Sequence, residues 1–228
     1  MLVHGFAGSI NEWVDSGVLA NLARDYRVIA LDLRGHGQSE KPHEVADYGE
    51  RMALDVIRLM DHLGIPKAHV VGYSQGARIV GFLLATHGNR FLSAVLGGSP
   101  PRVGWPEEEA RRSEQDAQDM EKRAKEGCSD GQDYIALAAV ARSRQRQVVT
   151  TDQLGEVTVP TIEIVGSEDP RLPGMQELKK QMPALQKVVV VDGATHGGEC
   201  GTMRRPEFVD AVRELIASRG PSAKGASR

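Results

Sequence analysis

The pattern of apolar positions along the chain predicts strands that alternate with helices. Short runs rich in β-branched residues recur, and most are followed by a segment in which apolar residues return at helical spacing. The runs are apolar almost throughout, which is typical of strands in a parallel sheet whose two faces are both covered. We therefore predict an α/β fold with a parallel twisted sheet and helices on both faces. The expected strands are 27–33, 68–73, 91–98, 161–166 and 187–193, and the expected helices lie near 48–62, 75–87, 174–181 and 207–218.

The alternation is interrupted once, between residues 100 and 155. This interval has no strand pattern and contains two charged helical stretches, PEEEARRSEQDAQDMEKRAKEG and GQDYIALAAVARSRQRQ. The apolar periodicity of the second stretch favours an inserted helical cap over a linker. We therefore expect a core formed by 1–99 and 156–228, with a cap over 100–155. The small and polar residues 220–228 are expected to form a frayed tail.

Composition and charge limit the classes of partner. The chain has 228 residues, of which 40% are hydrophobic, and a formal net charge of -3, which suits one globular unit with one sizeable core. Long blocks of lysine or arginine are absent, so a nucleic-acid partner is not expected. No apolar run approaches membrane-spanning length, and the N-terminus lacks the features of a secretory signal, so we expect a cytoplasmic protein with no membrane partner. Cys128 and Cys200 belong to no CxxC or Cys/His cluster, which gives no support for a disulfide or a zinc site.

The stretch VGYSQG places Ser74 between glycines at the joint of a strand and a helix. An apolar run, AHVV, precedes it, and ARIVGFLLATH follows with apolar residues at helical spacing. In a G-x-S-x-G turn the serine backbone is strained, and the residues two before and two after must lack side chains. Gly72 and Gly76 meet this need. The turn would expose the Ser74 hydroxyl and leave the amide of Gln75 free at the helix N-terminus, where a developing oxyanion is favoured.

Four further motifs accompany VGYSQG in the sequence: VHGFAGS (3–9), DLRGHGQS (32–39), VGSEDPRLP (165–173) and DGATHGGE (192–199). Together these five motifs resemble the α/β-hydrolase superfamily over nearly the whole chain. The four resemble, in turn, its oxyanion loop, its post-strand turn, the loop of its catalytic acid and its histidine loop. The resemblance implies a serine esterase or lactonase, with the catalytic residues in the order Ser, Asp, His.

Ser74, Asp169 and His196 are the expected catalytic residues. His196 follows the run KVVVVDG in a glycine-rich loop, where a histidine has no core to stabilise, and we interpret it as a general base. Glu168 and Asp169 are adjacent, and either carboxylate could orient the imidazole. The family pattern G-x-x-D-x-x-x-P implies Asp169 and leaves Glu168 as a solvated neighbour. The family turns imply scaffold roles for His4, Asp32, Arg34 and His36.

The chemistry expected of these residues is acyl transfer without a metal or an organic cofactor. Ser74 would attack a carbonyl, His196 would accept its proton and later return it, and water would release the acyl group. The amides of Gln75 and, by the resemblance, of Phe6 would hold the oxyanion. The expected function is hydrolysis of a small ester or lactone. The alternatives are carbon–carbon bond hydrolysis of a diketone, cofactor-free perhydrolysis, and a small-molecule receptor with negligible turnover. Epoxide hydrolases and haloalkane dehalogenases are disfavoured, because in those relatives an aspartate stands where this chain has Ser74.

Substrate preference is expected to come from the cap and from the residues that follow each strand. Aromatic residues make up only 4% of the chain, which argues against a broad lipid-binding groove and favours small acyl groups. Candidates for lining the substrate pocket are Phe6, Trp13, Tyr73, Trp105 and Tyr134.

The first strand of the expected sheet is a stub. Only Met1, Leu2 and Val3 precede His4, whereas members of the family usually have several apolar residues there and two strands before them. We therefore expect about six parallel strands with 27–33 at one edge. Because an uncovered apolar edge can pair with another chain, we expect homodimers through this edge and lower stability than in a version extended upstream.

Overall fold

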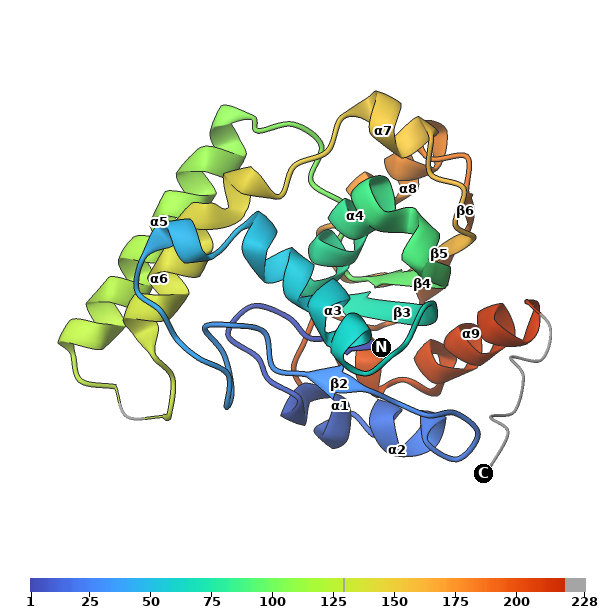
Figure 1. The fold of residues 1–228 in the computed structure, drawn as a ribbon, viewed down its shortest axis with the longest axis horizontal. Helices are drawn as coiled ribbons and strands as arrows, with labels where there is room; N and C mark the ends of the chain where they lie inside the picture. The colour runs from blue at the N-terminus through green and yellow to red at the C-terminus, as the bar shows by residue number, and fades with distance from the viewer. Residues whose placement is uncertain (129, 220–228) are drawn as a thin grey trace.

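The computed structural model describes residues 1–128 and 130–219, and these residues contain a six-stranded parallel sheet (Figure 1). The strand order is β2-β1-β3-β4-β5-β6. The predicted parallel sheet is therefore confirmed, with a two-residue first strand inside it and the 27–33 segment at one edge. The strands are β1 (Leu2–Val3), β2 (Ala30–Leu31), β3 (Ala68–Tyr73), β4 (Phe91–Gly97), β5 (Thr161–Gly166) and β6 (Leu185–Val191).

Helices cover both faces of the sheet because each presents an apolar stripe to it. In α3 (Glu50–His62), for example, the buried side chains are Met52, Ala53, Val56, Ile57 and Met60, which recur at helical spacing. This helix, α4 (Gln75–His87) and α8 (Leu172–Gln181) contribute to one apolar cluster. A second cluster joins α1 (Asn11–Asp15), α2 (Val18–Leu22) and α9 (Pro206–Ala217).

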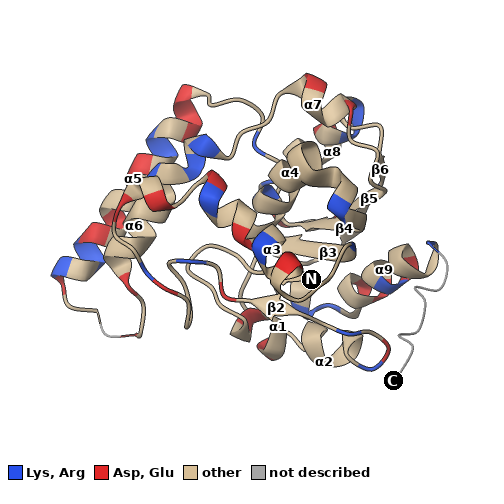
Figure 2. Ribbon diagram, in the orientation of Figure 1, with Lys and Arg blue, Asp and Glu red and all other residues tan. Residues whose placement is uncertain are grey.

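The interval predicted to form a cap is helical. It contains α5 (Glu107–Lys125), α6 (Tyr134–Ser143) and α7 (Thr151–Gly155). The α5–α6 pair stands to one side of the sheet in Figure 1, held together by Ala117, Ala138 and Ala141. Figure 2 shows acidic and basic residues along α5, whereas β3 and β4 have none. Leu154 of α7 packs into the core cluster, as do Ala136, Ala139 and Val140 of α6, so both helices contact the core. The division at residues 100 and 155 remains a proposal.

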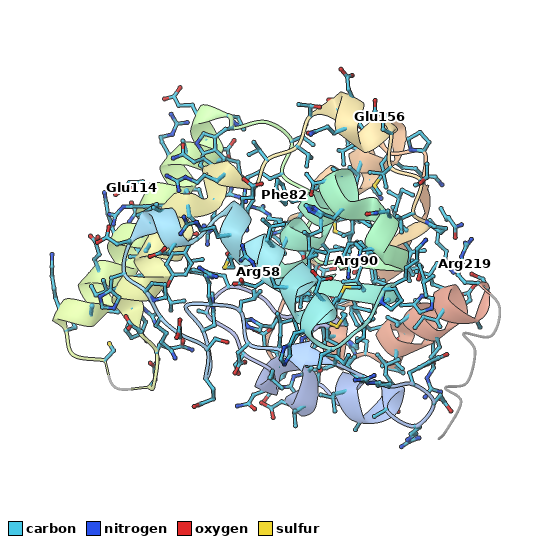
Figure 3. All side chains as sticks on the ribbon, viewed as in Figure 1. Arg58, Phe82, Arg90, Glu114, Glu156 and Arg219 are labelled. Atoms are coloured by element: carbon cyan, nitrogen blue, oxygen red, sulfur yellow. The ribbon has the colours of Figure 1, made fainter. Side chains whose placement is uncertain are left out.

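Most apolar side chains lie in the interior of the molecule, and most charged side chains lie at its surface. Phe82 of α4 is buried, whereas Glu156 and Arg219 lie at the periphery of the molecule (Figure 3). In the described parts of the chain, no helix combines the length and apolarity needed to cross a membrane. The same residues contain no group of three or more histidine, cysteine or acidic side chains placed to hold a metal ion. The predicted tail, 220–228, lies outside the described residues.

The predicted edge strand 27–33 is too long. Only Ala30 and Leu31 form β2, where they pair with Leu2 and Val3 of β1. Because β1 offers only these two residues, the ladder ends with them. The predicted dimer through this edge remains a prediction. The strand predicted at 187–193 is shifted, since β6 begins at Leu185 and ends at Val191, before the positive φ of Gly193.

Candidate active site

Ser74 lies on a sharp turn between β3 and α4. Its backbone has φ 54° and ψ -114°, a conformation that side-chain-bearing residues rarely adopt. The flanking glycines make the turn sterically possible. A Cβ on Gly72 would lie 2.3 Å from the carbonyl oxygen of Gly76, and one on Gly76 would lie 2.0 Å from that of Val3. The glycine requirement inferred from the sequence thus has a direct steric cause.

The structure brings Ser74, His196 and Asp169 into one hydrogen-bonded chain. The Nε2 atom of His196 lies 2.9 Å from the Ser74 Oγ, and Nδ1 lies 2.6 Å from Oδ2 of Asp169. The three residues follow β3, β5 and β6, whose carboxyl ends share one edge of the parallel sheet. Residues from distant parts of the sequence therefore meet at that edge.

Asp169, and not Glu168, is the carboxylate that contacts the imidazole. Asp169 is 2% exposed, whereas Glu168 points into solvent and accepts a hydrogen bond from Ser167. Burial raises the pKa of Asp169, but the hydrogen bond with His196 and the amide and guanidinium groups of Arg171 outweigh burial and hold the pKa below its ordinary value. The carboxyl group is therefore ionised at neutral pH, as an acceptor for the imidazole N–H requires.

The loop that carries His196 is held by Tyr73. The Tyr73 hydroxyl donates to the carbonyl oxygen of His196 at 2.6 Å, and the two rings lie 5.3 Å apart. Gly98 passes so close that a Cβ there would lie 2.9 Å from Cε1 of His196. Tyr73 was expected only to line the pocket, so its bond to the histidine loop is an addition to the prediction.

The loop resembling an oxyanion loop packs directly against the nucleophile. A Cβ on Gly5 would lie 3.3 Å from Cβ of Ser74, and Ala7 has a positive φ of 57°. His4 supports this loop from below, since its ring nitrogens contact the carbonyl oxygen of Gly5 and the amide of Leu33. The loop is thus anchored at the edge of the sheet beside Ser74.

The predicted scaffold roles are confirmed. Asp32 accepts hydrogen bonds from the amides of Ile10 and Gln38. Arg34 forms an ion pair with Asp55 of α3, and His36 contacts the carbonyl oxygen of Arg34. These side chains fix the two turns beneath the site.

A pocket of about 430 Å³ opens at Ser74. Phe6 and Tyr73 line it together with Ser74 and His196. The three other aromatic candidates are not among its lining residues, and each has a different role. Trp13 is fully buried against Phe208, the Trp105 ring packs under Arg102, and the Tyr134 hydroxyl donates to Asp130.

The pocket also contains polar residues that the sequence analysis missed. Glu12 accepts a hydrogen bond from the amide of Gly5 at 3.0 Å, and burial raises the pKa of its carboxyl group. Gln132 reaches the pocket from the cap and donates to the carbonyl oxygen of Ala7. Glu12 precedes the buried Trp13 in α1. The sequence signal that could have identified Glu12 as a pocket residue is an acidic side chain that follows closely on a loop of small residues.

Gln75 is buried at the start of α4, with 4% of its surface exposed. Neither its side-chain oxygen nor its side-chain nitrogen has a hydrogen-bond partner among the described residues. A buried amide without partners is unfavourable for folding. This is the residue whose backbone amide the sequence assigns to the oxyanion site.

Comparison with known proteins gives related sequences and folds. Residues 1–127 match the family described as alpha/beta hydrolase fold. The acetyltransferase component of the acetoin cleaving system of Pseudomonas putida is 46% identical over 79 residues, which are 35% of this chain and 20% of that protein. A fluoroacetate dehalogenase from a Burkholderia species is 36% identical over 112 residues, which are 47% of this chain and 36% of that protein. The chain therefore spans between a fifth and about a third of these relatives.

Among solved structures, a thermophilic esterase from Thermogutta terrifontis, with malate bound, superimposes with a TM-score of 0.81 at 25% identity. The match covers 96% of this chain and 89% of that one. Because the match covers nearly the whole chain, the likeness in fold extends beyond residues 1–127.

Proposed function

This chain belongs to the α/β-hydrolase fold family, and from that premise we propose that it is a serine hydrolase of small carboxylic esters or lactones. The observation that carries the proposal is the continuous hydrogen-bonded chain from Asp169 through His196 to the Oγ of Ser74. A buried carboxylate, an imidazole and a partly exposed hydroxyl in this order form a set that activates a serine as a nucleophile.

In the proposed reaction the Ser74 Oγ attacks the carbonyl carbon while its proton passes to Nε2 of His196. Asp169 fixes the imidazole tautomer and stabilises the imidazolium that results. The amides of Gln75 and Phe6 donate to the oxyanion. His196 then gives its proton to the leaving alcohol, and water, deprotonated by the same imidazole, hydrolyses the acyl-enzyme and restores the Ser74 hydroxyl.

Two features support an ester or lactone as the substrate. The pocket volume of about 430 Å³ suits a small molecule. The structural neighbour from Thermogutta terrifontis, solved with malate bound, is an esterase. A displacement like that of a dehalogenase is disfavoured here, because Ser74 supplies a hydroxyl where a carboxylate nucleophile would be needed.

The proposed function is tested by turnover of 4-nitrophenyl butyrate. We expect nitrophenol release to continue far beyond one equivalent per protein molecule, because water can deacylate the serine. A receptor with the same residues would release about one equivalent and stop. Measurement of nitrophenol at several protein concentrations distinguishes an enzyme from a receptor. Release that ends at one equivalent per protein molecule would contradict the proposed enzymatic function.

A second prediction concerns the choice between the adjacent carboxylates. Replacing Asp169 by Asn should lower kcat by at least about 10²-fold, because Asn cannot enforce the required tautomer or balance the imidazolium charge. Glu168→Gln should change kcat little, since Glu168 is exposed and does not contact His196. Both variants are assayed on 4-nitrophenyl butyrate after their melting temperatures are compared, and equal losses of kcat would reopen the choice.

A further inference from the structure

Three arginines gather where the cap meets the nucleophile turn. Arg78 lies on α4 one turn after Ser74, and its amide donates to the Ser74 carbonyl oxygen at 3.2 Å. Arg102 lies on the chain that leaves β4 for the cap, and Arg144 lies at the chain's exit from α6. Their side chains are 16%, 3% and 9% exposed, respectively. The entry to the cap and its exit each contribute one buried cation, and the core contributes a partly buried one.

Two carboxylates of α5 face these three cations. A single oxygen of Glu109, Oε2, accepts from Arg78 at 3.2 Å and from Arg102 at 3.3 Å, and Asp116 pairs with Arg144. Glu109 is shared among three guanidinium groups, since Arg112 of α5 also pairs with it at 3.7 Å, and neither the Arg78 nor the Arg102 contact has the bidentate geometry that makes such pairs strong. The arginine cluster therefore has more positive charge than its partners neutralise.

Other observations agree that the cluster is short of acceptors. The Nε atom of Arg144 is buried and has no hydrogen-bond partner in the described part of the chain. Burial, together with the guanidinium groups of Arg78 and Arg144, holds the pKa of Arg102 well below its ordinary value. Buried cations crowded in this way would be stabilised by an additional anion.

The cluster lies beside the reaction site, with Phe6 between Arg144 and the pocket. The guanidinium carbon of Arg144 lies 4.5 Å from the centre of the Phe6 ring, and Phe6 lines the pocket that contains Ser74. Arg78 shares the first turn of α4 with the residues that follow the nucleophile. Arg78 and Arg144 are therefore fixed to the two segments that would hold an acyl group on Ser74, and Arg102 is joined to Arg78 through Glu109. The leaving group would depart towards His196, which protonates it.

We propose that Arg78, Arg102 and Arg144 form a subsite for a carboxylate on the acyl portion of the substrate. Guanidinium groups suit this ligand because their planar N–H pairs match the two oxygens of a carboxylate. The substrate class is then a monoester of a short dicarboxylic acid. The inference rests on the serine hydrolase function proposed above, whose activity it narrows to an anionic substrate.

The test compares mono-4-nitrophenyl adipate with 4-nitrophenyl hexanoate, in which a methyl group replaces the distal carboxylate. For the native chain we expect kcat/KM to be at least roughly tenfold higher for the adipate, as expected for a hydrogen-bonded charged group. Free adipate should also inhibit hydrolysis of the hexanoate more strongly than free hexanoate does. This comparison needs no variant and is therefore independent of folding effects.

Arg144→Met should lower the adipate-to-hexanoate ratio of kcat/KM by roughly 10- to 100-fold, because it removes a charged donor. Arg111→Met removes the same charge from an exposed position on α5, where Arg111 pairs only with Glu107, and should leave the ratio unchanged. Melting temperatures of both variants are measured alongside, so that a loss of stability is not mistaken for a loss of selectivity.

The outcomes separate the two proposals. If neither ester is turned over, the hydrolase function itself fails. If the hexanoate is hydrolysed at least as well as the adipate, the hydrolase stands and the carboxylate subsite is overturned. A lower melting temperature of Arg144→Met with an unchanged ratio would also overturn it, since the arginines would then only join the cap to the core.

Discussion

Ser74→Ala is expected to lower kcat on 4-nitrophenyl butyrate by at least about 10⁴-fold, because no other group can form the acyl-enzyme. The fold should be retained. Among the described residues, the Ser74 hydroxyl forms a side-chain hydrogen bond with His196 alone, and alanine meets the same backbone strain at a φ of 54°. The rate loss is measured at saturating ester, and the melting temperature should stay close to that of the native chain.

A serine-reactive phosphonate gives an independent measure of the same assignment. Mass spectrometry should detect one adduct on the native chain and none on Ser74→Ala. Ser9 also lines the pocket, so Ser9→Ala is the matched control in which the adduct should persist. Labelling that persists in Ser74→Ala would show that another residue is the nucleophile.

The local sequence is enough to predict the nucleophile turn. The predicted strand 68–73 and helix 75–87 coincide with β3 and α4. A β-branched run, two glycines around a serine and an apolar helical pattern each favour the same local structure, and no distant contact is needed to choose between alternatives. Edge strand β2 is the opposite case. The length of β2 depends on how many residues β1 offers for pairing. The apolar pattern of 27–33 carries no information about β1, so it cannot predict where β2 ends.

The candidate site is only partly predictable for a similar reason. The sequence leaves Glu168 and Asp169 as alternatives, and the family pattern selects Asp169, which is the one that the turn after β5 directs at His196. The pocket lining is harder to predict, because it depends on how the 5–16 segment, the 196–204 segment and the connection between α5 and α6 meet around Ser74. Glu12 enters the pocket because Gly8 has no side chain, since a Cβ there would lie 1.9 Å from Oε1 of Glu12.

Replacing Glu163 by leucine is expected to stabilise the protein at neutral pH. Glu163 lies in β5 between Leu96 of β4 and Val188 of β6, is fully buried, and has no partner for either carboxyl oxygen among the described residues. Burial raises its pKa to about 9 from the ordinary value of 4.5. The native state therefore keeps the carboxyl group protonated while the unfolded chain ionises it.

The sign of the pH effect follows from this difference. The stabilisation is fully present below a pH of about 4.5 and falls as the pH rises towards 9. Between these values the free energy of unfolding should fall by about 1.4 kcal/mol per pH unit, or about 3 kcal/mol by pH 7. Glu163→Leu cannot ionise, so its advantage over the native chain should be of that order at pH 7 and should shrink towards pH 5.

Urea unfolding at pH 5, 6, 7 and 8 measures both the gain and its slope. Glu163→Gln isolates the titration, because the amide keeps the shape and polarity of the side chain but has no proton to lose, so its free energy of unfolding should lack this slope. Glu168→Gln removes an acidic residue from the exposed turn that follows the same strand and should retain the slope of the native chain. If the native and Glu163→Gln proteins respond equally to pH, then Glu163 is ionised in the folded state, and an unrecognised partner must compensate its charge.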